Sequence, residues 1–308
     1  MPHFERLTIG DREFVDAYMR RYGEKSAHHS FASLWCFDAS ERAMIAEQDD
    51  FLLVRRTAYD TEDTFCCMPP FGDARDEEGF GKAVDALLAG ARAENKVLCF
   101  RHVTAGRRAL LERLYPGGFT YTPSRDHAEY LYKAETLAAL EGGEMQKRRA
   151  ELRRFERNYG DRITVKDIGN ETAEDIRAFQ RTWLAERIEA GASEMSLTAE
   201  NDAVTRALDS LSVLRPGGVV LYLDGRVCGY EIGFGISENT FDSMFAKGDR
   251  NVKDVYRKIH NEMAMTARDA GYAYINLEED LGDAGLRKTK TEYHPIALIE
   301  MAEAKAKM

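Results

Sequence analysis

The 308-residue chain lacks several features that mark particular protein classes. No run approaches the roughly 18 apolar residues of a membrane-spanning helix, and the N-terminal residues lack the basic-then-apolar pattern of a signal peptide. The five cysteines form no Cys-x-x-Cys pair, and the adjacent Cys66 and Cys67 have poor geometry for a disulfide with each other. These absences predict a cytoplasmic protein with free thiols.

An excess of positive charge and the spacing of metal ligands are also missing. The formal net charge is -10, from 43 basic and 53 acidic residues, so a polyanion would have to bind a local cationic patch. The seven histidines show no metal-ligand spacing, and His28-His29 and His260 are interpreted as structural or solvated. No serine lies in a nucleophile-elbow motif. We therefore expect no metal, no cofactor and no covalent acyl-enzyme.

The apolar pattern predicts an α+β protein of two domains. The chain is 44% hydrophobic, and its length suits one large domain or two of ordinary size, of which we favour two. Apolar residues recur at helical and strand spacing in both halves. Asp224-Gly225 between two apolar runs is a strong hairpin signal. Gly142-Gly143 is the best break in the pattern, so we expect domains at 1–142 and 143–308, the second carrying the active site.

The order of the expected elements points to an acyltransferase fold. Over residues 172–301 the pattern predicts helix, helix, hairpin, strand, helix, strand, helix and strand. That is the order of the GNAT fold, the fold of acyl-CoA N-acyltransferases, and it is an analogy from order alone. Because the first half has a similar mixture, the expected architecture is two tandem GNAT-like mixed sheets flanked by helices.

A cationic cluster near the C-terminus is the densest group of functional residue types. Three acids end a strand-like run at 278–280, and Arg287, Lys288 and Lys290 then follow within four positions. Arg287 and Lys290 share a helix face, whereas Lys288 points elsewhere. Arg287 can bind a phosphate or carboxylate through two parallel hydrogen bonds, and Lys290 adds a point charge. The alternative is a surface helix whose cations pair with neighbouring acids.

Several motifs together resemble the phosphatidylglycerol lysyltransferase C-terminal-like family, whose relatives include Fem-type transferases. The most specific is the C-terminal block: Asn276 to Gly282, Gly285 to Lys290, Tyr293 and Pro295. Weaker matches lie at Pro69 to Gly72, Ser124 to Lys133, Lys147-Arg148-Arg149 and Phe245 to Asp249. The resemblance implies a tandem GNAT-like fold and transfer of an aminoacyl group from a charged tRNA to an amine or hydroxyl acceptor.

This chain departs from the family in two places. Lipid-modifying members carry a large membrane domain, so we expect a soluble member without one, and the acceptor stays open among a small molecule, a peptide and a lipid headgroup. The basic helix reads Lys-Arg-Arg-Ala-Glu-Leu-Arg-Arg, where relatives tend to show Lys-Arg-Asn. Its role in this chain is therefore open as well.

Three residues are candidates for catalysis. Glu231 lies inside a strand-like run of apolar and aromatic residues, which suits a general base that takes a proton from the acceptor. Strand alternation can equally turn its side chain to solvent. Glu279, at the end of a strand, is a second candidate base, and a water is a further alternative. Lys247, after the expected strand 241–246, is a third candidate, which would hold the ester carbonyl, or else an exposed loop cation.

The substrate site is expected around the same loops. The residues expected to bind substrate are Lys247, Asp249, Asn276, Arg287, Lys290 and Tyr293. The segment 247–254 has one glycine and acids where a coenzyme A-binding GNAT needs a Gln/Arg-x-x-Gly-x-Gly/Ala loop to hold pyrophosphate. This difference argues against coenzyme A.

The helix expected at 144–159 is locally basic. It has six bases and three acids, and Arg149, Arg153 and Arg157 fall on one face at i, i+4 and i+8. With Lys147, these residues form a candidate surface for the tRNA backbone. The alternative is an amphipathic helix with Glu–Arg pairs.

The leading interpretation is therefore an aminoacyl-tRNA-dependent acyltransferase that acts by direct attack. Two alternatives stay open. One is an acyl-CoA-dependent N-acyltransferase, and the other is a catalytically degenerate member that only binds an anionic ligand or a partner protein.

Overall fold

The computed structural model describes residues 2–191 and 193–307, and the chain divides into two compact units. The first unit comprises Met1–Glu129, Glu279–Gly282 and Ile299–Met308, and the second comprises Tyr130–Glu278 and Asp283–Leu298. The chain thus leaves the first unit at Glu129 and returns to it twice. The expected boundary between functional domains at Gly142-Gly143 stays a prediction.

The first unit is a mixed sheet with helices. Its strands lie in the order β1-β2-β3-β4-β5-β12-β6, with β4 and β5 parallel to each other. The strands are β1 (Glu5–Arg6), β2 (Ala43–Gln48), β3 (Phe51–Arg56), β4 (Thr64–Cys67), β5 (Val97–Thr104), β12 (Ala297–Ala306) and β6 (Phe119–Lys133). The helices are α1 (Arg12–Tyr22), α2 (Phe31–Cys36), α3 (Asp38–Glu41), α4 (Glu77–Ala93) and α5 (Ala105–Leu114).

Helix α4 provides much of the core of the first unit. Phe80, Val84, Leu87 and Ala91 recur at helical spacing and are buried against β3, β4 and β5. The helix begins where the side chain of Asp76 accepts a hydrogen bond from the backbone N–H of Gly79, at 2.9 Å.

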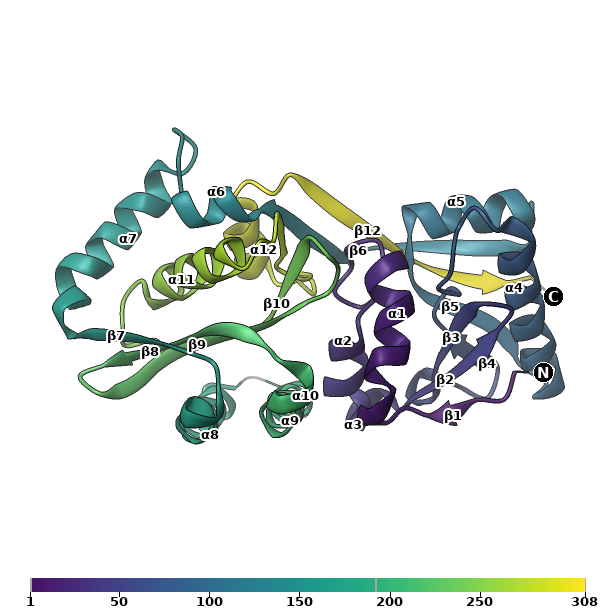
Figure 1. Ribbon diagram of the computed structural model, residues 1–308, viewed down its shortest axis with the longest axis horizontal. Helices are drawn as coiled ribbons and strands as arrows, with labels where there is room; N and C mark the ends of the chain where they lie inside the picture. The colour runs from purple at the N-terminus through teal and green to yellow at the C-terminus, as the bar shows by residue number, and fades with distance from the viewer. Residues whose placement is uncertain (1, 192, 308) are drawn as a thin grey trace. The chain divides into compact units, whose positions relative to one another are not determined.

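The second unit has the element order of the GNAT fold (Figure 1). Its strands lie in the order β6-β11-β10-β9-β8-β7, with β10 and β11 parallel. The remaining strands are β7 (Ile163–Asp167), β8 (Gly217–Leu223), β9 (Arg226–Gly235), β10 (Thr240–Gly248) and β11 (Tyr274–Asn276). The helices are α6 (Ala134–Ala139), α7 (Gln146–Tyr159), α8 (Asn170–Glu189), α9 (Glu194–Asp209), α10 (Leu211–Leu214), α11 (Val255–Asp269) and α12 (Ala284–Thr291). The predicted α+β class with mixed sheets flanked by helices is confirmed.

The β8–β9 hairpin turns at Asp224-Gly225, as predicted. Both residues have positive φ, 51° and 78°. Positive φ at both central positions is what a two-residue turn between right-twisted strands requires, and Asp-Gly adopts it at low cost.

Alternate residues of β9 face different helices. The hydroxyl of Tyr230 donates to Gln180 of α8 at 2.6 Å, whereas the next residue, Glu231, contacts α11. Figure 1 shows α11 on one face of this sheet and α8 with α9 on the other. Helix α11 buries Ile259 and Met263 against the sheet, and this packing sets the positions of the side chains beside them.

Candidate active site

Glu231 lies at the centre of a buried polar group on the α11 face of the sheet. Its side chain has no exposed surface. The carboxylate Oε2 lies 2.8 Å from Nδ1 of His260, and Oε1 accepts a hydrogen bond from the hydroxyl of Ser243 on β10. The structure therefore turns Glu231 into the protein rather than to solvent.

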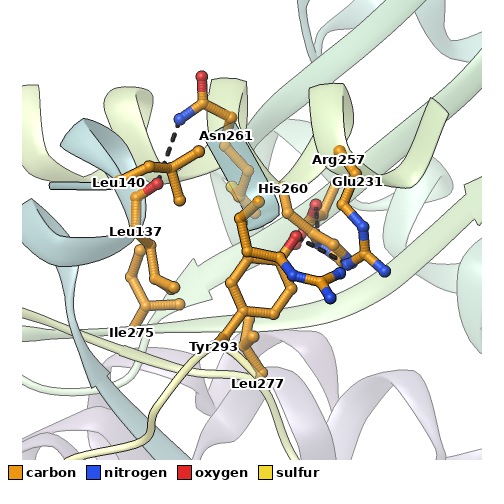
Figure 2. Close-up of a pocket in the computed structure, with 11 residues that line it drawn as sticks. Leu137, Leu140, Glu231, Arg257, His260, Asn261, Ile275, Leu277 and Tyr293 are labelled. Atoms are coloured by element: carbon orange, nitrogen blue, oxygen red, sulfur yellow. Dashed lines mark hydrogen bonds and ion pairs between the residues drawn. The ribbon is translucent and has the colours of Figure 1, made fainter. Parts of the chain in front are cut away.

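His260 extends this group toward Tyr293. Its side chain keeps 18% of its surface exposed. The two rings meet edge to face, with centroids 6.1 Å apart and planes at 86°. Figure 2 shows His260 beside Glu231, with the Tyr293 ring next to it.

Tyr293 is a buried ring held by two arginines. Nη1 of Arg257 donates to its hydroxyl at 2.9 Å. The guanidinium carbons of Arg148 and Arg257 lie 5.6 Å and 5.3 Å from the ring centroid, within cation–π range. Burial raises the pKa of Tyr293, against the lowering effect of the arginines, so the phenol keeps its proton.

These side chains surround a small enclosed cavity (Figure 2). Its polar lining consists of Arg148, Glu231, Arg257, His260, Asn261 and Tyr293, and its apolar lining of Leu137, Leu140, Met263, Ile275 and Leu277. About 10 Å³ is available to the centre of a water-sized sphere. That is room for about one water, so an acyl group has to bind outside this space.

A network of arginines and glutamates closes one side of the cavity. Arg148 is almost fully buried and forms salt bridges with Glu292 and, at 2.8 Å, with Glu151. Arg257 also contacts Glu151, at 3.0 Å. A hydrogen bond from Lys147, together with the charge of Arg148, lowers the pKa of Glu292. Two arginines and two glutamates thus largely neutralise one another.

Lys247 lies on the opposite face of the sheet. The expected end of its strand at Ala246 is wrong, because β10 continues to Gly248. Lys247 is buried, with Nζ 2.6 Å from Glu200 of α9 and 4.8 Å from the ring centroid of Trp183. It is therefore an internal ion pair and not an exposed loop cation.

The side chains of Asp249 and Asn276 each accept a hydrogen bond from the backbone N–H two residues later. Oδ1 of Asp249 accepts hydrogen bonds from the backbone and side chain of Asn251, at 2.8 Å and 3.0 Å. Asn276 is fully buried in β11, and its Oδ1 accepts from the backbone N–H of Glu278 at 2.7 Å. Asp249 also lines an open groove of about 500 Å³ with α8 residues such as Trp183.

Arg287 and Lys290 lie on α12, as predicted, and both are half-buried. Nζ of Lys290 donates to the backbone carbonyl of Leu277, a residue of the cavity lining. Lys290 and Tyr293 therefore adjoin the cavity that Glu231 also lines, whereas Lys247 contacts α8 and α9. The predicted binding role of Arg287 and Lys290 stays a prediction.

Glu279 belongs to the first unit by its contacts. Its carboxylate lies 3.6 Å from Nε2 of His28, and its side chain is mostly buried. Its predicted role as a base stays a prediction.

The predicted residues of the basic helix α7 differ in their contacts. Lys147 pairs with Glu292 at 2.9 Å. Arg149 donates to the carbonyls of Leu140 and Gly142, beyond the end of α6. Arg153 and Arg157 are exposed and form no ion pair within residues 2–191 and 193–307. Only these two are available in full to an external polyanion.

Sequence reasoning missed four side chains of this site: Arg148, Ser243, Arg257 and His260. Arg148 lies within the Lys147-Arg148-Arg149 match, but that match assigned it no role in the site, and no local motif marks the other three. The only weak signal is the spacing of Tyr256 and His260, which puts both on one face of α11.

The family comparison agrees with this architecture. The family described as "Phosphatidylglycerol lysyltransferase, C-terminal" matches residues 19–301. The chain belongs to this family. No curated protein matches the sequence.

Two solved structures share this fold. A conserved protein of unknown function from Bacteroides thetaiotaomicron is 28% identical, with a TM-score of 0.92 and coverage of 100% of both chains. L-PGS from Bacillus licheniformis is 15% identical, with a TM-score of 0.67 and coverage of 96% of this chain and 92% of that one. The family and the shared fold support an acyltransferase-like function. Among the helices that the structure describes, none has the length and apolar character needed to cross a bilayer.

Proposed function

We propose that this chain transfers an aminoacyl group from aminoacyl-tRNA to an amine or hydroxyl acceptor by direct attack. The observation that carries the proposal is the family match over residues 19–301, because that family is named for a lysyl transfer. The buried group of Glu231, Ser243 and His260 in the second unit adds a chemical reason, since attack on an ester requires a proton acceptor.

The remaining chemistry is positioning and electrostatics. The acceptor attacks the ester carbonyl carbon, and negative charge develops on the carbonyl oxygen. Arg287 and Lys290 of α12 are the cations proposed to stabilise that charge. Arg153 and Arg157 are proposed to contact the tRNA backbone, because they are exposed on a locally basic helix. The acceptor is a small molecule, a peptide or a lipid headgroup.

Coenzyme A is a poorer fit as the donor. The segment between β10 and α11 carries Asp249 and Asp254, and Asp254 occupies the position before the first residue of α11. Asp254 is paired with Arg154 at 2.5 Å, and residues 247–254 contain one glycine, whereas a coenzyme A loop uses two glycines to expose backbone N–H groups to the pyrophosphate. We expect calorimetry with coenzyme A and acetyl-coenzyme A to show no specific binding, and micromolar binding would favour the acyl-CoA-dependent alternative.

Transfer of label from charged tRNA tests the proposal. The protein is incubated with tRNA charged with a mixture of radiolabelled amino acids and, in parallel, with lipid, peptide and small-molecule fractions of a cell extract. We expect label to move into one fraction in a form that survives nuclease treatment. Heat-denatured protein is the control. Absence of transfer into every fraction, with intact charged tRNA recovered, would contradict the proposal.

A further inference from the structure

Glu231 is too deeply placed to touch a substrate itself. Its side chain has no exposed surface, and both carboxylate oxygens have partners within the protein, Ser243 on one side and His260 on the other. A base has to come within hydrogen-bond distance of the proton that it accepts. Glu231 does not meet this requirement, although its residue type and strand position suggest the role.

His260 is better placed than Glu231, because its side chain is partly exposed whereas that of Glu231 is not. Because an ionised carboxylate only accepts hydrogen bonds, the 2.8 Å contact puts a proton on Nδ1 of His260, and in the neutral imidazole the lone pair is then on Nε2. No described residue hydrogen-bonds to Nε2, and the side chain is partly exposed. The rings of Tyr256 and Tyr293, each with its centroid 6.1 Å from that of His260, restrict the imidazole from two sides.

We infer that His260 is the catalytic base of this acyltransferase and that Glu231 is its positioning residue. Ser243 in turn fixes the carboxylate of Glu231 through the other oxygen. The inference rests on the proposed function, since it assigns the proton transfer of that reaction. A buried carboxylate that selects the tautomer of an adjacent imidazole is a recurrent way to orient a histidine base.

The proton balance of the step is simple. As the acceptor nitrogen or oxygen forms a bond to the ester carbonyl carbon, Nε2 of His260 takes the proton from that atom. When the tetrahedral intermediate collapses, the bond from the carbonyl carbon to the ribose oxygen of the tRNA breaks. The ribose oxygen then takes the proton from Nε2. His260 ends the cycle neutral, and no other reactant is consumed.

Nitrogen NMR of histidine-labelled protein tests the pair without any assay of activity. The His260 signals are assigned by their loss in His260→Gln. At neutral pH we expect a protonated Nδ1 and an unprotonated Nε2. Glu231→Gln should change that tautomer, because an amide can donate to Nδ1. The matched control is Glu262→Gln, which removes a carboxylate of α11 that pairs with Lys258 and should leave the tautomer unchanged. Protonation of Nε2 in the unaltered protein would overturn the inference.

Kinetics on the labelled-tRNA assay supply the second measurement. His260→Gln should lower kcat by about 100- to 10,000-fold with little change in KM, the range for loss of a general base. Ser243→Ala should lower kcat less, because His260 and Glu231 both remain. His3→Gln, at an exposed histidine, is the matched control. Circular dichroism melts identify any variant that fails to fold, and Ser243→Ala then carries the test.

The two failures can be told apart. If the unaltered protein transfers no aminoacyl group, the proposed function fails, and the NMR result still decides whether Glu231 orients His260. If transfer occurs and folded His260→Gln turns over normally, His260 is not the base, although the proposed function stands.

Discussion

Arg148 of α7 forms a salt bridge with Glu292, the residue that follows α12, while its guanidinium faces the ring of the adjacent Tyr293. One buried side chain thus ties the basic helix to the end of the helix that carries Arg287 and Lys290. It also closes one side of the cavity beside His260.

We expect Arg148→Ala to destabilise the protein by about 3 kcal/mol. Removing one member of a buried ion pair leaves its partners without compensation, at a cost of about 3–5 kcal/mol, and partial exposure of Glu292 puts this case at the lower end. Urea denaturation measures the change. The matched control is Arg153→Ala on the same helix, at an exposed position, with an expected change within about 0.5 kcal/mol. Equal stabilities of the two variants would contradict the structural role of Arg148.

Stability should fall as the pH drops below about 6.5. The rings of His28 and His102 are in contact, with centroids 3.7 Å apart and planes at 37°, and Nη1 of Arg56 lies 3.3 Å from Nε2 of His102. Burial, together with the charge of Arg56, lowers the pKa of both histidines well below the usual range. Below the unfolded pKa the unfolded chain therefore binds more protons than the folded chain, so protonation favours unfolding.

Below the unfolded pKa, the free energy of unfolding should fall by about 1.4 kcal/mol per pH unit for each histidine, or by about 2–3 kcal/mol per pH unit for the pair. Urea midpoints between pH 7.5 and pH 5 measure it. His102→Asn should weaken the pH dependence of stability, because it removes one of the two histidines. Asparagine is chosen because it tolerates the positive φ of 55° at that position. The control His3→Gln should retain the full slope. A midpoint independent of pH in the unaltered protein would show that these histidines do not control stability.

If charged tRNA binds, Arg153 and Arg157 should account for part of its salt dependence. Replacing both with glutamine should lower the slope of log K against log[salt] by about 1.4–1.8, at about 0.7–0.9 for each lost phosphate contact. The charge-matched control replaces Arg108 and Arg113 of α5, which pair with Glu112 and Glu77. The same loss in both double variants would indicate a general charge effect and not a surface on α7.

Arg287 should contribute to transfer rather than to folding. We expect Arg287→Ala to lower kcat/KM by the equivalent of about 2–4 kcal/mol, as for loss of one oriented electrostatic donor. Arg287→Lys should not restore the rate, because an ammonium lacks the planar fork of a guanidinium. Lys288→Ala, at the exposed neighbouring position, is the control. A normal rate for Arg287→Ala would remove Arg287 from the proposed site.

Features with local causes could be predicted from the sequence. The β8–β9 hairpin depends on Asp224-Gly225 and its own backbone conformation. Tyr293 was predicted through the C-terminal motif, and the structure places it at the cavity.

Features that depend on distant partners could not be predicted. Glu231 and His260 are 29 residues apart, and Arg148 and Glu292 are 144 residues apart. Whether a strand carboxylate faces solvent or a helix depends on which face the helix covers, and the alternation of β9 alone fits both cases. Helix α11 packs on the face of the sheet toward which Glu231 points, and it brings His260 into contact with that carboxylate.

The division of the chain has a consequence for how the protein is made on the ribosome. Strand β12 pairs with β5 through Met301 to Lys305, so the sheet of the first unit depends on residues that are synthesised after the second unit. Until those residues emerge, β5 lacks this neighbour and presents an unpaired strand edge of the kind that invites aggregation. The N-terminal unit can therefore complete its sheet only after Met301 to Lys305 have left the ribosome, and a nascent chain stalled before Ile299 should be a preferred target for chaperones.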